Sequence, residues 1–261
     1  MIVARSINEL DLPRHGVVGL VPTMGALHPG HTALFRAARP GCDVLVASVF
    51  VNPVQFSDGA DLAAYPRDFA RDATLAEAEG VDVIFAPSAE AMYPPGFATW
   101  VVPEGSAEGL ESAHRPGHFR GVATVCLKLF NIIRPEIAWF GQKDAQQVAV
   151  LKQLVRDLNV GVEIRVVDTV RDTDGLALSS RNARLTADER ERARAIPRAL
   201  ETRDEAQARA VLECAGIEPD YVAVADLDGP TLAVAARVGA VRLIDNVRLV
   251  DNVPFREGET P

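Results

Sequence analysis

Short apolar runs alternate with longer stretches of helical composition over the first two-thirds of the chain. The apolar runs lack an apolar–polar alternation, which is typical of strands buried on both faces of a parallel sheet. They predict strands at 17–21, 44–51, 81–87, 137–141 and 162–170. The intervening stretches predict helices at 31–38, 67–79, 120–132 and 144–158. This alternation indicates an α/β protein with a Rossmann-like parallel sheet and helices on both of its faces.

The pattern changes near residue 186. A charged, Ala-rich stretch predicts helix, and "YVAVADLD" and "VRLIDNVRLV" predict two short strands after it. Thr186 and Glu189 have the spacing of a capping box at the start of that helix. We therefore expect a Rossmann-like domain over residues 1–170 and a smaller C-terminal α+β domain, a lid or cap, over residues 171–261. The final "EGETP" is expected to fray.

Polar segments follow four of the predicted strands at the point where each strand ends. They are "PTMGALHPGH" at 22–31, "NPVQF" at 52–56, "QKDAQQ" at 142–147 and "RDTDGLALSSRN" at 171–182. In open parallel sheets, ligands bind beyond the carboxyl ends of the strands. The sequence therefore predicts a site for a polar ligand at this edge.

The first of these segments holds two histidines. Pro29 and Gly30 fit the start of a helix, so His31 falls in its first turn and His28 just before it. Free backbone N–H groups and the helix dipole favour anions there, and imidazole N–H groups can add hydrogen bonds to phosphate. Two partly exposed turn histidines are an equally good interpretation of these residues alone. A metal site is less favoured, because no third or fourth ligand with suitable spacing lies nearby in the sequence.

Composition narrows the function classes. The chain has 261 residues, 48% of them hydrophobic and 24% charged, and a net charge of −9, which argues against a surface that grips nucleic acid. Its three cysteines lie far apart and form no CxxC pair, which favours a reducing, cytoplasmic setting. No run approaches the roughly 18 apolar residues of a membrane span, so no membrane partner is expected. P-loop, GxGxxG, HExxH and GxSxG motifs are absent from the sequence.

Six segments, in their order along the chain, resemble the pantothenate synthetase (pantoate–β-alanine ligase) family of the HxGH nucleotidylyltransferase superfamily. They are "PTMGALHPGH", "FVNPVQF", "YPRDFARD", "RPGHFRGVATV", "GQKDAQQ" and "DGLALSSRN". The resemblance implies ATP-dependent condensation of pantoate with β-alanine through a pantoyl adenylate, with release of AMP and pyrophosphate. It also implies Mg²⁺ with the ATP and a homodimer. The HxGH element alone would equally fit another nucleotidylyltransferase, and a relative without turnover would be a small-molecule-binding protein.

The resemblance implies roles for individual residues. The catalytic set, placed on the triphosphate, is His28, His31, Lys143, Ser179, Ser180 and Arg181. Further residues implied to bind ATP are Met24, Gly141, Asp144, Val170 and Leu178. Residues implied to bind pantoate or β-alanine are Asn52, Gln55, Gln147, Arg115, His118 and Tyr65. Asp72 is expected to assist Mg²⁺ indirectly, and Gln142 departs from the glutamate that most members of the family carry.

Taken alone, several of these residues have ordinary structural interpretations. Asn52 fits an Asn-Pro turn, Lys143 a solvated surface lysine and the 115–118 loop an interdomain turn. Ser179 is a poor candidate to cap the helix that follows, because Thr186 is better placed. Cys42 and Cys126 stand in apolar runs and are expected to be buried.

Overall fold

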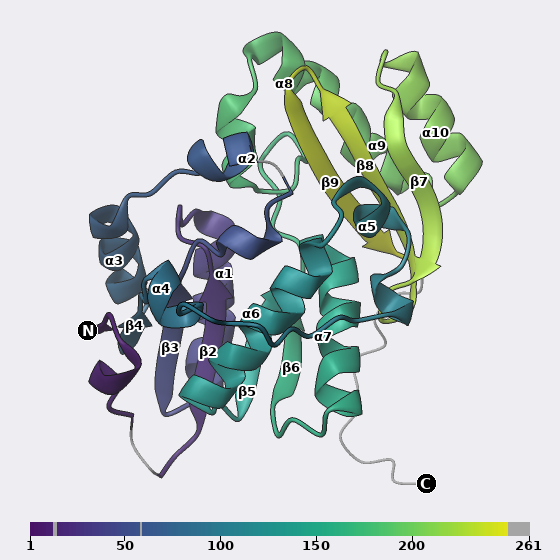
Figure 1. Ribbon diagram of the computed structural model, residues 1–261. Helices are drawn as coiled ribbons and strands as arrows, with labels where there is room; N and C mark the ends of the chain where they lie inside the picture. The colour runs from purple at the N-terminus through teal and green to yellow at the C-terminus, as the bar shows by residue number, and fades with distance from the viewer. Residues whose placement is uncertain (13–14, 58, 250–261) are drawn as a thin grey trace, which may run out of the picture.

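The computed structural model describes residues 1–12, 15–57 and 59–249 (Figure 1). Six parallel strands form one sheet in the order β1-β4-β3-β2-β5-β6. Their bounds are β1 Ile2–Ala4, β2 Val18–Thr23, β3 Val44–Val49, β4 Val83–Phe85, β5 Ile137–Gly141 and β6 Glu163–Val167. The strand order reverses between β2 and β5, which creates the switch point where such sheets bind ligands. The five predicted strands are confirmed, whereas the three-residue edge strand β1 was not predicted.

Helices cover both faces of this sheet, as expected (Figure 1). The four predicted helices are α1 Pro29–Ala38, α3 Phe69–Ala78, α6 His118–Ile133 and α7 Ala145–Asp157. Leu20 and Val46 share a hydrophobic core with α6 and α7, whereas Val21 and Leu45 share one with α1 and α3. Neighbouring residues of a strand thus enter opposite cores, which explains why the strands read as continuous apolar runs.

Short helices fill the connections. The α-helices among them are α2 Gly59–Ala63, α4 Ala89–Met92 and α5 Leu110–His114. The 3₁₀-helices are η1 Ile7–Glu9, η2 Arg39–Gly41, η3 Pro53–Gln55, η4 Gly105–Ala107, η5 Gln142–Asp144 and η6 Ser180–Arg184. Of these, η3 follows β3, η5 follows β5, and η6 lies in the segment after β6, so they begin where the sheet presents its carboxyl edge.

The C-terminal part of the chain forms a second, antiparallel sheet in the order β7-β8-β9. Its elements are α8 Ala187–Ala193, α9 Ala195–Glu201, α10 Glu205–Cys214, β7 Pro219–Asp226, β8 Pro230–Val238 and β9 Val241–Arg248. The predicted capping box of α8 is present, with the Thr186 hydroxyl accepting from the Glu189 N–H and the Glu189 carboxylate accepting from the Thr186 N–H. The central strand β8 was not predicted, because its Ala-rich run shows no strand alternation.

A cluster of apolar residues joins the two parts of the molecule. Ala145 and Ala149 of α7 pack against Leu227 and Ala233 of the second domain. The boundary expected near residue 170 stays a prediction, and the expected fraying of "EGETP" lies outside the described residues. Among the residues that the structure describes, no helix combines the length and apolar character needed to cross a bilayer.

The two cysteines expected in the core differ in burial. Cys126 on α6 is buried, and burial raises the pKa of its thiol to about 12. Cys42 is only half-buried. It lies between η2 and β3, and its thiol is 3.4 Å from the carbonyl oxygen of Ala38. The expectation of full burial is therefore wrong for Cys42.

Candidate active site

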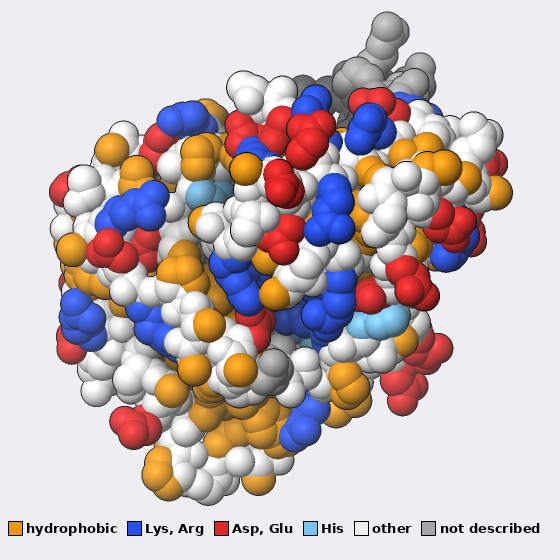
Figure 2. All heavy atoms as spheres, turned by 90° about the horizontal axis from the view of Figure 1, so that it is seen from above, with side chains coloured by type: hydrophobic (Ala, Val, Ile, Leu, Met, Phe, Trp, Pro, Cys, Tyr) orange, Lys and Arg blue, Asp and Glu red, His pale blue; other side chains and the backbone are white. Residues whose placement is uncertain are grey.

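A cleft of about 230 Å³ lies at the carboxyl edge of the parallel sheet, beside the switch point between β2 and β5. Of the residues to which the sequence assigned a catalytic or binding role, all but Asp72 line it: Met24, His28, His31, Asn52, Gln55, Tyr65, Arg115, His118, Gly141, Lys143, Asp144, Gln147, Val170, Leu178, Ser179, Ser180 and Arg181. A wider cavity of about 370 Å³ shares Arg115, Lys143 and Arg181 with the cleft and extends to the second domain. Figure 2 looks onto this end of the molecule, where Lys and Arg side chains gather among acidic ones around a central hollow.

Asp72 fixes the loop that enters the site from β2. Its buried carboxylate accepts hydrogen bonds from the backbone N–H groups of Ala26 at 2.9 Å and Leu27 at 2.7 Å. Gly25 and Ala26 both adopt positive φ values, of 76° and 50°, so this turn needs outside support. The described hydrogen bonds of the Asp72 carboxylate thus support this loop, and its expected indirect assistance to Mg²⁺ stays a prediction.

His28 and His31 form a capping box at the N-terminus of α1. The Nδ1 atom of His28 accepts from the N–H of Gly30 at 3.1 Å, and Nδ1 of His31 accepts from the N–H of His28 at 3.3 Å. Because both Nδ1 atoms accept, each neutral ring carries its proton on Nε2. A Cβ on Gly30 would lie 2.8 Å from the His28 ring, so glycine leaves room for that imidazole.

Both imidazoles are neutral at pH 7. Burial first, and the Lys143 ammonium second, lower the pKa of His28 to about 4. Burial, His28 and Lys143 lower the pKa of His31 to about 3. The ring centroids lie 4.1 Å apart. The backbone N–H groups of Gly30, His31 and Thr32 all donate to His28, so the expectation of free backbone N–H groups at this helix end is wrong. The two rings can still serve both interpretations, because Nδ1 of each ring supports the helix start while Nε2–H stays available as a donor.

Neutral amides form another part of the cleft. Nδ2 of Asn52 donates to Oε1 of Gln55 at 2.9 Å and to the Gly121 carbonyl at 3.2 Å, while Oδ1 accepts from the Tyr93 hydroxyl at 2.9 Å. Asn52 is 1% exposed, so it acts as a support for Gln55. The Gln55 amide in turn donates to the Met24 sulfur at 3.1 Å. The Gln147 side chain forms no hydrogen bond with any described residue, which leaves its donors and acceptor for a ligand.

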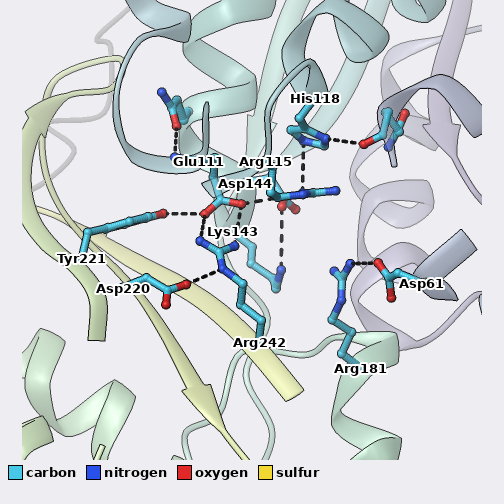
Figure 3. Close-up of polar contacts among 12 residues, drawn as sticks. Asp61, Glu111, Arg115, His118, Lys143, Asp144, Arg181, Asp220, Tyr221 and Arg242 are labelled. Carbon is cyan, nitrogen blue, oxygen red and sulfur yellow. Dashed lines mark hydrogen bonds and ion pairs between the residues drawn. The ribbon is translucent and has the colours of Figure 1, made fainter. Parts of the chain in front are cut away.

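The 115–118 loop is tied to the same pocket. Arg115 can only donate, so its contact of 3.2 Å makes Nε2 of His118 an acceptor (Figure 3). The proton of His118 then lies on Nδ1, which donates to the Gln55 carbonyl at 3.0 Å. Burial, together with the Arg115 charge, lowers the pKa of His118 to about 4. The loop therefore lines the cleft with a fixed cation and a neutral imidazole.

Lys143 is held from the second domain, a contact that the sequence did not predict. Nδ2 of Asn246 on β9 donates to the carbonyls of Gln142 at 2.9 Å and Lys143 at 2.8 Å. The Gln142 amide donates to Oδ1 of Asn246 at 3.1 Å and accepts from Arg248 at 2.8 Å. An ionised glutamate at position 142 could accept from Arg248 but could not donate to Asn246, so the amide suits these partners.

The 179–181 segment faces the cleft from the start of η6. Ser179 caps this 3₁₀-helix, accepting from the Arg181 N–H at 3.3 Å, so its side chain has a capping role that the sequence interpretation placed only at Thr186. Arg181 forms an ion pair with Asp61 of α2 at 3.0 Å. Tyr65 lines the cleft as well, and burial raises the pKa of its hydroxyl.

The three neutral histidines predict a loss of stability in mild acid. Each has a pKa lowered in the folded protein to about 3 or 4 from an ordinary 6.5, so below pH 6.5 the unfolded chain binds more protons than the folded one. The free energy of unfolding is therefore expected to fall as the pH is lowered from about 6.5 towards 4. Urea unfolding at pH 7.5, 6.0 and 5.0 measures this. His118→Asn should reduce the slope, and an unchanged slope would contradict the assignment.

The fold and the site together define a class: α/β proteins whose ligand cleft lies at the switch point of a parallel sheet, with the N-terminus of a helix on one side. A family model described as pantoate-beta-alanine ligase matches residues 3–248. The chain belongs to this family. It is a ligase by that membership, and the matched residues extend through both sheets.

Curated and solved relatives agree. Pantothenate synthetases from Chloroflexus aurantiacus and Heliobacterium modesticaldum are each 52% identical, over 88% and 95% of this chain and 91% and 99% of their own. A crystal structure of the Thermus thermophilus pantothenate synthetase is 45% identical with a TM-score of 0.89, covering 95% of this chain and 99% of that one. A Francisella tularensis pantoate–β-alanine ligase, complexed with beta-gamma ATP and β-alanine, is 37% identical with a TM-score of 0.87, covering 95% and 98%.

Proposed function

We propose that the cleft joins pantoate to β-alanine in two half-reactions. The pantoate carboxylate attacks the α-phosphorus of MgATP and pyrophosphate leaves, and the β-alanine amine then attacks the acyl carbon and AMP leaves. A carboxylate and an amine do not condense directly, because oxide is a very poor leaving group, and adenylation supplies a good one. The observation that carries this proposal is that two imidazoles beside Lys143 and a pocket of neutral amides line one cleft.

The triphosphate is assigned to the end of the cleft where cations and N–H donors converge. Nε2–H of His28 and of His31 donate to phosphate oxygens, and Lys143 adds a positive charge that also keeps both rings neutral. The Ser179 and Ser180 hydroxyls and the Arg181 guanidinium line the cleft from the start of η6. The remaining residues assigned to ATP are Met24, Gly141, Asp144, Val170 and Leu178, with Asp144 on the ribose.

Pantoate is assigned to Gln55 and Gln147, whose amides can bind its hydroxyl groups and carboxylate without neutralising the attacking charge. Arg115, His118 and Tyr65 face the same pocket and are assigned to the pantoate and β-alanine side. Asn52 acts through Gln55, as its hydrogen bonds indicate. The two substrates would thus meet between the phosphate donors and the amide pocket.

Mg²⁺ is assigned to the nucleotide. Hard cations on ATP are held mostly by phosphates and water. Among the described residues, no group of three or more His, Cys, Asp or Glu side chains could hold a metal ion, which fits a cation that arrives as MgATP. On the family resemblance we further propose a cytoplasmic homodimer in which the second domain acts as a lid.

An isotope-exchange assay tests the function. With pantoate, ATP and Mg²⁺ but no β-alanine, labelled pyrophosphate should exchange into ATP, and this exchange should stop with EDTA. Adding β-alanine should release AMP and pantothenate in equal amounts. No pantoate-dependent exchange would overturn the proposal in favour of another nucleotidylyltransferase or a binding protein, and exchange without amide would limit the chain to the first half-reaction.

A tight contact at Gly121 predicts a selective defect in the pantoate pocket. A Cβ there would lie 2.7 Å from the Val54 carbonyl and 2.8 Å from the Gln55 nitrogen, so Gly121→Ala must displace η3. We expect the pantoate KM to rise about tenfold and stability to fall by about 1–3 kcal/mol. Gly161→Ala, where nothing lies within 4 Å, is the matched control and should change neither. An unaltered pantoate KM in Gly121→Ala would contradict the role of η3.

A further inference from the structure

A buried charged cluster joins the two domains beside the cleft (Figure 3). Its centre is Glu111 on α5, which is 5% exposed. Arg242 on β9 donates to both of its carboxylate oxygens, at 2.7 and 2.9 Å, and the Tyr221 hydroxyl of β7 donates at 2.9 Å. The Nε of Arg242 also donates to Asp220 at 2.6 Å. Arg115, which also pairs with Glu111, was singled out in the sequence. Glu111, Arg242, Tyr221 and Asp220 were not.

Glu111 is held in place by its backbone as well as by its side chain. Its N–H donates to Oε1 of Gln146 on α7 at 3.0 Å. The preceding residues, Gly109 and Leu110, have φ values of 65° and 41°, and a left-handed conformation at a leucine persists only where the surroundings impose it. The short helix α5 therefore presents the carboxylate at a fixed position.

The Glu111 carboxylate is ionised at neutral pH. Burial alone would raise its pKa, but the Arg242 guanidinium, Arg115 and the Tyr221 hydroxyl bring the pKa below its usual value. A buried carboxylate between two arginines keeps both of them in defined positions. Arg242 has a second counter-charge in Asp220, whereas Glu111 is the one carboxylate that pairs with Arg115 among the described residues.

One of these two arginines lines the cleft. Arg115 lies 3.6 Å from Glu111 through its Nη1 atom, which also donates to Nε2 of His118 at 3.2 Å. His118 donates from Nδ1 to the Gln55 carbonyl at 3.0 Å. A continuous series of polar contacts thus runs from Glu111, which does not line the cleft, to Gln55, which does.

We propose that Glu111 is a positioning residue for the carboxylate substrates: it holds Arg115 and, through His118, the Gln55 end of the pantoate pocket. The inference rests on the proposed function, because it concerns the binding of pantoate in that cleft. Glu111 lines the wider cavity but not the cleft, so its replacement is expected to alter pantoate binding through Arg115 and not through a lost contact with pantoate. Arg242, Tyr221 and Gln146 keep the carboxylate in place.

Glu111→Gln tests the proposal, with Asp220→Asn as a matched control. Both substitutions replace a carboxylate that accepts from Arg242 by an amide, but only Glu111 also faces Arg115. In Glu111→Gln we expect the pantoate KM in the exchange assay to rise about tenfold, with the ATP KM and the exchange rate at saturating pantoate within about twofold of the wild type. In Asp220→Asn the pantoate KM should stay within about twofold.

The double variant Glu111→Gln/Arg242→Gln covers the case in which the single variant fails to fold. It removes both charges of the buried Glu111–Arg242 pair together, and it still leaves Arg115 without its carboxylate. Asp220 also loses Arg242 in this variant, but its side chain is 18% exposed to solvent. A raised pantoate KM in this variant supports the proposal. A wild-type pantoate KM in either folded variant, with only a lowered Tm, would overturn it.

The same experiment separates the two levels of inference. Wild-type protein without pantoate-dependent exchange would overturn the proposed function, and the positioning role with it. Normal wild-type exchange, together with equal KM values in Glu111→Gln and Asp220→Asn, would overturn the positioning role alone.

Discussion

Replacing His31 with glutamine should lower pantoate-dependent pyrophosphate exchange by about 100- to 1000-fold while changing the free energy of unfolding by less than about 0.5 kcal/mol. His31 has two functions that this substitution separates. Its Nδ1 accepts the N–H of His28 in the capping box, and glutamine at the third helical position is a common residue for that contact. Its Nε2–H is the donor assigned to the phosphates, and glutamine does not place a donor there.

His31→Ala provides the comparison, because alanine removes both the cap acceptor and the Nε2–H donor. It should lose exchange to a similar extent and, in addition, about 1 kcal/mol of stability measured by urea unfolding. Full exchange in His31→Gln would show that the imidazole does not act on the phosphates. A large loss of stability in His31→Gln would show that the ring is mainly structural.

Replacing Lys143 with methionine should reduce exchange by about 100-fold, because a cation beside the phosphates is lost while most of the length of the side chain is kept. The substitution has a second consequence that does not depend on activity. The Lys143 charge helps to lower the pKa of His28 and of His31, so both pKa values should rise in Lys143→Met. NMR titration of the imidazole protons without substrate measures this rise.

Lys152→Met is the control for that experiment. Lys152 lies further along, on α7, where it pairs with Asp228 at 2.7 Å and does not line the cleft, so its removal should leave exchange and both histidine titrations as in the wild type. If the pKa values of His28 and His31 did not rise in Lys143→Met, the placement of the ammonium beside the rings would be wrong. If they rose but exchange stayed normal, Lys143 would have no role in the chemistry.

Local sequence patterns predicted most of the parallel domain. The strand runs are apolar because both faces are covered, and Pro29 fixes the start of α1, so the position of His28 and His31 at a helix end followed from adjacent residues. The carboxyl-edge rule then brought the Gln55, Lys143 and 179–181 segments together without any knowledge of the contacts.

Features that depend on distant residues could not be predicted in the same way. Glu111 and Arg242 are 131 positions apart, and neither has a local neighbour that marks it as one half of a buried ion pair. The same is true of Gln142 and Asn246, which are 104 positions apart. β8 was missed for a different reason. This central strand is rich in alanine, many of its positions are not β-branched, and it shows no alternation of apolar and polar residues.

The place of β9 in the chain also bears on how the protein is made. During synthesis the strands of the parallel sheet and the residues that line the cleft leave the ribosome before β9 does. The parallel sheet can therefore begin to fold on the nascent chain. Three residues of β9, Arg242, Asn246 and Arg248, hold Glu111, Gln142 and the Lys143 backbone. A nascent chain that ends before this strand therefore carries the cleft residues without these anchors, and the anchored cleft forms only when translation has passed Arg248.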